Sequence, residues 1–185
     1  MYTYEISGKI YYVAGRLEIQ GELPAEKKAV IISVPHTSNW DFFWGELAFL
    51  SQGIPAFILM KKEFFFFPLG MILRALNVIP VDRGNKDSQL VEQMITEFKQ
   101  RDSMYLCITP EGSRKKRKKW KKGFLVIAKA AGVPVYLGRI DYKGKYCEVG
   151  PLFYPTEDVD ADLAYIMSTY HDANPKYPEN FSNGN

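Results

Sequence analysis

The chain has 185 residues, 46% hydrophobic and 24% charged, which predicts one globular domain with its own core and excludes a disordered chain. Its longest stretch without a charged residue, 47–60, holds 14 residues including a glycine and a proline, which is too short for a membrane-spanning helix. The net charge of +3 is unevenly distributed, because eight of the 24 lysines and arginines lie within 114–122 and the other sixteen face 21 acidic residues, a balance of −5.

Neither the cysteines nor the first residues indicate secretion. Two cysteines, Cys107 and Cys147, are too few for a disulfide framework or a self-sufficient metal site, so we expect no metal. The chain begins with neither a basic leader nor the apolar stretch of a signal peptide. We therefore expect a cytoplasmic protein.

Short strands and then alternating strands and helices are predicted along the chain. Over the first twenty or so residues apolar and polar side chains alternate, which predicts two or three short antiparallel strands within 1–28. Apolar runs typical of strands covered on both faces follow at 29–34, 56–60, 78–81, 104–109 and 133–140. Helices are predicted at 41–51, 66–76, 88–100, about 119–131 and 160–170.

This alternation predicts an α/β fold: a single domain with a mostly parallel central sheet flanked by helices and a short antiparallel N-terminal strand region. We expect a core at 29–154, followed by a C-terminal helix and tail at 155–185. Ligands gather at the carboxyl ends of such strands, so residues there are the first candidates for function.

A histidine and an aspartate follow the first buried strand, at His36 and Asp41. An imidazole accepts a proton near neutral pH, and a carboxylate on its other nitrogen holds the tautomer and stabilises the cation. The alternative is structural: Ser38 caps the next helix with Asp41 at the third helical position, and His36 only bonds a backbone carbonyl. These residues alone leave both interpretations open.

Two later strand ends carry arginines. Arg83 lies in an Asp-Arg-Gly sequence. Either this sequence is only a turn, or it directs the guanidinium of Arg83 toward a phosphate. In the loop at 109–114, Gly112 allows the backbone to approach a ligand, and together with Arg114 this suits an anion. The same residues are also ordinary loop composition.

Two segments indicate a surface partner. The eight positive charges within 114–122 repel one another, which favours an anionic partner such as phosphate, a membrane or nucleic acid over mere solvation. Residues 61–68 combine two lysines with four consecutive phenylalanines, which cannot all face inward on one helix or strand. Either part of this run contacts lipid or an acyl chain, or a loop buries it.

In chain order these segments resemble the blocks of the glycerolipid acyltransferase family. The blocks are His-x-x-x-x-Asp at 36–41, Ile-Pro-Val-Asp-Arg at 79–83, Pro-Glu-Gly-Ser-Arg at 110–114 and Val-Pro-Val at 133–135, with Lys-Lys-Glu-Phe at 61–64 between the first two. The resemblance implies a glycerol-3-phosphate acyltransferase-like fold. It also implies transfer of an acyl group from acyl-coenzyme A or acyl-carrier protein to the hydroxyl of a lysophospholipid, typically 1-acylglycerol-3-phosphate, in phospholipid biosynthesis.

The resemblance further implies roles for single residues and no bound cofactor, the acyl donor being a substrate. His36 would remove the proton from the acceptor hydroxyl, and Asp41 would hold and stabilise the imidazolium. The acceptor phosphate would be held by Lys61, Arg83 and Arg114. The remaining candidates support the third block, Glu111, Gly112 and Ser113, or contact the membrane or the donor, Lys115, Lys116, Arg117, Lys118 and Lys119.

The chain departs from the family pattern in three respects. Ser113 stands where threonine is more common, strand-like alternation replaces a hydrophobic N-terminal helix, and the cationic run is denser. Membrane association would therefore be peripheral, at the inner face, through the cationic run and the phenylalanines. The alternatives are a binding module for a membrane surface or nucleic acid, and a thioesterase; the −5 balance of the rest of the chain disfavours nucleic acid.

Overall fold

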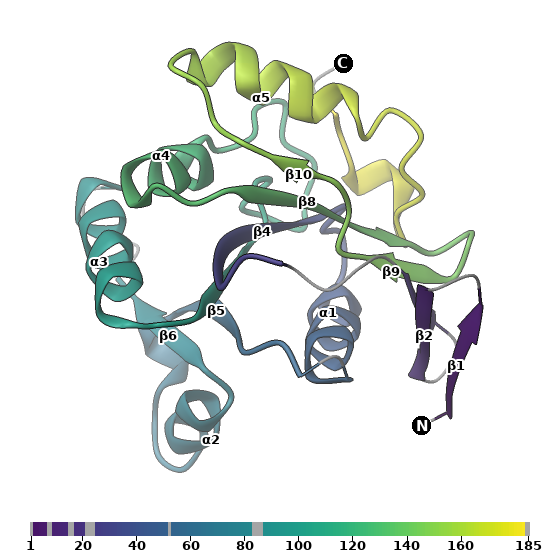
Figure 1. The fold of residues 1–185 in the computed structure, drawn as a ribbon, viewed down its shortest axis with the longest axis horizontal. Helices are drawn as coiled ribbons and strands as arrows, with labels where there is room; N and C mark the ends of the chain where they lie inside the picture. The colour runs from purple at the N-terminus through teal and green to yellow at the C-terminus, as the bar shows by residue number, and fades with distance from the viewer. Residues whose placement is uncertain are drawn as a thin grey trace.

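The fold is built on one large sheet. The computed structural model describes residues 2–6, 9–14, 17–20, 25–51, 53–82 and 87–183. Within them the strands are β1 (Tyr2–Ile6), β2 (Lys9–Ala14), β3 (Leu17–Gln20), β4 (Lys28–Val34), β5 (Ala56–Lys61), β6 (Val78–Val81), β7 (Met104–Ile108), β8 (Val135–Asp141), β9 (Tyr146–Glu148) and β10 (Leu152–Phe153). Their spatial order is β1-β2-β3-β9-β8-β4-β7-β5-β6, and β10 pairs with β8 (Figure 1).

The strand directions confirm the predicted fold class. The central strands β8, β4, β7, β5 and β6 pair in parallel. At one end, β1, β2 and β3 form the expected antiparallel N-terminal region. Because β4 lies between β7 and β8, the loops that follow these three strands leave the sheet side by side.

Helices cover both faces of the sheet. They are α1 (Asn39–Ser51), α2 (Leu69–Ala75), α3 (Asp87–Gln100), α4 (Gly123–Ala131) and α5 (Val159–Ser168), with short 3-10 helices η1 (Lys62–Phe64) and η2 (Pro178–Asn180). Val30 and Ile32 of β4 belong to the core shared with α3, α4 and α5. The alternate residues Ala29 and Ile31 belong to a second core cluster that includes Phe49 of α1. Because successive side chains of a strand point to opposite faces of the sheet, β4 contributes apolar residues to the core on both faces.

Two predicted helix starts are wrong. The helix expected from residue 119 begins only at Gly123, because the positive end of the helix dipole disfavours the preceding lysines and because Trp120 is buried elsewhere. The helix expected from residue 66 begins at Leu69, since the residue before a proline is pushed out of helical backbone geometry.

The cationic segment, defined as residues 114–122, is an exposed loop anchored by one buried side chain. Trp120 packs on Tyr170 and Phe181, and its Nε1 donates to the carbonyl of Ser182 at 2.9 Å. The six residues before it, 114–119, are exposed. The anchor therefore joins the cationic segment to the C-terminal segment, residues 171–183, which packs back on the core rather than trailing away.

Candidate active site

The connection from β4 to α1 is organised by its own side chains. Ser38 Oγ accepts from the backbone N–H of Trp40 at 3.1 Å, and Asp41 Oδ2 accepts from the backbone N–H of Ser38 at 2.7 Å. Asp41 Oδ2 also accepts from the N–H of Thr37 at 2.7 Å. This is the reciprocal capping expected from the sequence, and it satisfies N–H groups at the start of α1.

The same carboxylate lies beside His36. His36 Nδ1 is 3.3 Å from Asp41 Oδ2, with 20% of the histidine side chain exposed but only 2% of the aspartate side chain. The Nδ1 atom is not aligned for a hydrogen bond with any group among the described residues. Capping of the helix therefore does not prevent Asp41 from facing His36, because the same carboxylate does both. The Nε2 atom of His36 is then the ring nitrogen directed away from this pair.

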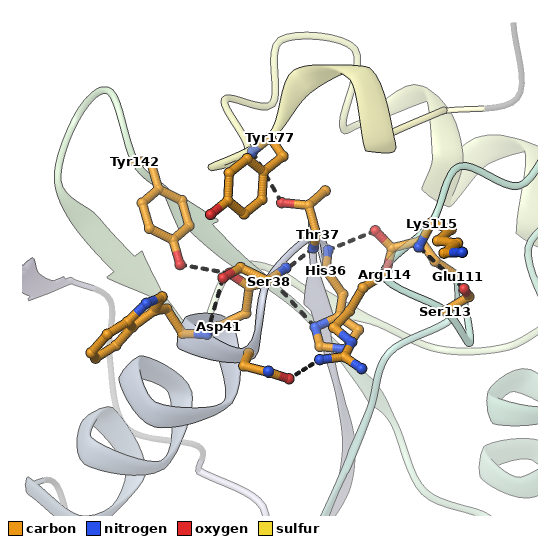
Figure 2. A network of polar contacts seen from close by, with 12 residues as sticks. His36, Thr37, Ser38, Asp41, Glu111, Ser113, Arg114, Lys115, Tyr142 and Tyr177 are labelled. Atoms are coloured by element: carbon orange, nitrogen blue, oxygen red, sulfur yellow. Dashed lines mark hydrogen bonds and ion pairs between the residues drawn. The ribbon is translucent and has the colours of Figure 1, made fainter.

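A tyrosine from beyond β8 completes the surroundings of Asp41. The hydroxyl of Tyr142 donates to Asp41 Oδ1 at 2.6 Å, as Figure 2 shows. Partial burial and this hydrogen bond raise the pKa of Tyr142, so the hydroxyl stays protonated and remains a donor. Asp41 therefore accepts three hydrogen bonds that hold its carboxylate in one orientation.

Glu111 reaches the site from the loop after β7. Its Oε1 accepts from the backbone N–H of His36 at 2.8 Å, while Oε2 is buried without a hydrogen-bond partner among the described residues. Burial raises the pKa of Glu111 to about 7, against the opposing effects of His36. The sequence suggested that Glu111 supports its own loop, and the structure adds a contact that crosses to the loop that carries His36, as Figure 2 shows.

Glycine and arginine shape the loop after β7. Gly112 has a φ of 63°, in the left-handed region that favours glycine, and its N–H donates to the carbonyl of Thr109 at 3.0 Å. Ser113 Oγ accepts from the N–H of Lys115 at 3.1 Å. Arg114 donates to Asn39 Oδ1, which brings its guanidinium to the start of α1.

These loops enclose an open cleft of about 1200 Å³. His36 lines it together with Trp40 from α1, Lys61 from the end of β5, and the loop after β7. Four cationic side chains line the cleft against two acidic ones: Lys61, Arg114, Lys115 and Arg117 against Glu63 and Glu179. The cleft therefore favours an anionic ligand next to an imidazole.

The sequence-predicted residues divide into four groups. His36, Lys61, Gly112, Ser113, Arg114, Lys115 and Arg117 line the cleft, and Asp41 and Glu111 contact the loop that carries His36. Lys116, Lys118 and Lys119 are exposed on the cationic segment away from the cleft lining. Arg83 lies outside the described residues.

Sequence reasoning missed two contributions to the site. One is Tyr142, and the other is the C-terminal segment, in which Tyr177, Glu179 and Asn180 line the cleft. The N–H of Tyr177 donates to Thr37 Oγ1 at 3.3 Å, and Lys176 lies 5.2 Å from the centre of the Trp40 ring. The aromatic residues in this otherwise polar segment were the available signal for a packed structure.

Comparison with known proteins adds one finding about this chain. A family model described as Acyltransferase matches residues 16–137, which is more than half of the chain. Searches of curated proteins and of solved structures returned no match. The matched region contains His36, Asp41 and Arg114 and ends before Tyr142. Among the described residues no helix has the length and apolar character needed to cross a bilayer.

Proposed function

The chain belongs to the acyltransferase family, and from this premise we propose that it moves a fatty acyl group from a thioester to a lysophospholipid hydroxyl. The donor is acyl-coenzyme A or acyl-carrier protein, and 1-acylglycerol-3-phosphate is the proposed acceptor, in phospholipid biosynthesis. The observation that carries the proposal is the pairing of His36 with buried Asp41 at a cleft lined by cations.

The proposed chemistry is general base catalysis without an acyl-enzyme. His36 Nε2 takes the proton of the acceptor hydroxyl, and the oxygen forms a bond to the thioester carbonyl carbon. Asp41 stabilises the imidazolium that forms. Collapse of the tetrahedral intermediate breaks the carbon–sulfur bond, and the leaving thiolate recovers the proton from His36. The products are an ester and a free thiol.

The cationic side chains divide between the two substrates in this proposal. Lys61 and Arg114 hold the acceptor phosphate, with Arg83 assigned to the same task from the sequence alone. The cationic residues Lys115, Lys116, Arg117, Lys118 and Lys119 contact an anionic membrane, at its inner face, or the phosphates of the donor. Their exposure supports this role, because exposed side chains can reach an anionic surface. Each lysine or arginine near such a surface contributes about 1 kcal/mol to binding.

Thiol release from palmitoyl-coenzyme A, with and without 1-acylglycerol-3-phosphate, tests the function. We expect release that depends on the acceptor, a diacyl product identified by mass, and loss of nearly all activity in His36→Ala. His171→Ala is the matched control, because His171 is the chain's other histidine and is exposed in the C-terminal segment. Equal release of free fatty acid with and without acceptor would identify a thioesterase, and an active His36→Ala protein would remove the mechanism.

A further inference from the structure

Helix α1 is apolar on the face it turns to solvent. Trp40, Phe43, Leu47 and Leu50 are 52%, 56%, 43% and 56% exposed. Their spacing of three, four and three residues places them on one side of the helix. The opposite side already buries Ala48 and Phe49 against the sheet. A helix at the surface of a globular protein normally turns polar residues outward, so the fold itself does not account for this stripe.

A second apolar surface is formed by η1, α2 and the residues between them. Its exposed side chains are Phe64, Phe66, Phe67, Met71 and Ile72. Phe67 is 83% exposed, and Figure 1 shows α2 standing away from the sheet beyond β6. Trp40 and Phe64 both line the cleft, so each of the two apolar surfaces adjoins it. Globular proteins rarely expose this much apolar surface without a partner.

The charges around these surfaces indicate which partner they fit. The acidic residues of α1 are Asp41, which is buried, and Glu46, which is half-buried. Its outward stripe is therefore free of negative charge. Lys176 lies on the ring of Trp40, and Lys61 lies exposed before η1. Tryptophan with flanking lysines beside apolar side chains is the composition of segments that lie in an anionic membrane interface.

We propose that the stripe of α1 and the η1–α2 surface dock on an anionic lipid bilayer, with the cleft opening onto its surface. Trp40, Phe43, Leu47 and Leu50 enter the boundary between headgroups and acyl chains, while the lysines remain at the headgroups. The proposal deepens the proposed function by identifying the apolar docking surface, and it rests on that function only in taking lipid as the partner.

The test measures binding to vesicles in the absence of any acyl donor. Vesicles of phosphatidylcholine with about one third phosphatidylglycerol are sedimented with the protein, and tryptophan emission is recorded. We expect the wild type to sediment with the vesicles and its emission to shift to shorter wavelength, because Trp40 leaves water. The double variant Leu47→Glu, Leu50→Glu is expected to bind about tenfold or more weakly.

The matched control is Val126→Glu, Leu152→Glu, which places the same two charges at exposed apolar positions of α4 and β10. We expect this control to bind like the wild type. Equal binding by the α1 double variant and the wild type would overturn the proposal. So would a wild type that ignores vesicles but forms a dimer that the α1 double variant disrupts, since the stripe would then cover a second copy.

Failure of docking and failure of the proposed acyl transfer are distinguishable. Leu47 and Leu50 do not line the cleft, so turnover of a short-chain, monomeric thioester and lysolipid is expected to survive in the double variant. Thermal unfolding verifies that both double variants fold. Turnover retained with vesicle binding lost supports docking at α1, whereas vesicle binding without any turnover overturns the acyl transfer and leaves the docking intact.

Discussion

The hydroxyl of Tyr142 donates a 2.6 Å hydrogen bond to Asp41, a residue 101 positions earlier in the chain. The bond joins the end of β8 to the start of α1 and orients the carboxylate that faces His36. Tyr142 lies beyond the region matched by the family model. We therefore expect Tyr142 to act as a positioning residue that this chain supplies from outside that region.

Replacing Tyr142 by phenylalanine tests this role. We expect Tyr142→Phe to lower kcat about tenfold, because a hydrogen bond to a charged group contributes about 1.5–3 kcal/mol and Tyr142 is only half-buried. The KM for the thioester is expected to stay unchanged. Steady-state kinetics beside Tyr154→Phe, at an exposed tyrosine, provides the comparison. A Tyr142→Phe protein with wild-type kcat contradicts the positioning role.

Arg114 is expected to act on the acceptor rather than on the chemical step. Arg114→Ala should raise the KM for 1-acylglycerol-3-phosphate about tenfold or more, since one charge-assisted contact to the phosphate is lost. The effect on kcat should be smaller. Lys118→Ala removes an exposed charge of the same segment that does not line the cleft, and its KM for 1-acylglycerol-3-phosphate should match that of the wild type. Equal KM values for the two variants would argue against a phosphate contact.

Glu111 makes the stability of the protein depend on pH. Its pKa is raised to about 7 by burial, above the ordinary value of 4.5. Between these two pH values the folded state therefore holds a proton that the unfolded state has released. The stabilisation is complete below pH about 4.5 and is lost as the pH rises to about 7. Its size is on the order of 3 kcal/mol.

Urea unfolding at pH 5 and pH 8 measures this contribution. The free energy of unfolding of the wild type should fall more between these pH values than that of Glu111→Gln. The glutamine keeps an oxygen for the N–H of His36 but does not ionise. The same pH dependence in both proteins would show that Glu111 ionises in the folded state as readily as in the unfolded state.

Alanine substitutions at two glycines with the same backbone conformation distinguish an effect on the geometry of the cleft loop from an effect on stability. Gly112 and Gly132 have φ values of 63° and 67°, so alanine at either position should cost about 1–2 kcal/mol of stability. Only Gly112 lies in the cleft. We expect Gly112→Ala to lower turnover and Gly132→Ala, at the end of α4, to leave it unchanged. Similar loss of turnover in both would attribute the effect to stability alone.

Local sequence is sufficient to predict the central strands, most of the helices and the capping residues of the candidate site. The uninterrupted apolar runs predicted the central parallel strands, because strands covered on both faces need no polar side. Ser38 and Asp41 are three residues apart, which is the spacing that capping of α1 requires. Hydrophobic spacing alone places the start of α4 too early, because it takes no account of the repulsion between the lysines and the positive end of the helix dipole.

Tertiary structure decided which distant residues complete the site. Glu111 follows β7 and Tyr142 follows β8, and both reach the connection after β4 because β4 lies between those strands. Strand order depends on how the whole sheet closes, and no residue near His36 encodes it. The C-terminal segment forms one wall of the cleft for the same kind of reason, because the burial of Trp120 holds it against the core.

The sequence likewise does not predict which side of α1 carries the exposed apolar stripe. Trp40, Phe43, Leu47 and Leu50 alternate with further apolar residues around the helix, so hydrophobicity alone assigns no outward face. Only the packing of Ala48 and Phe49 on the sheet determines which apolar side chains remain in contact with solvent. The sequence by itself thus determined the strands, the helix cap and the cationic segment. The sheet order and the helix packing decided which residues surround His36 and which apolar side chains of α1 remain exposed.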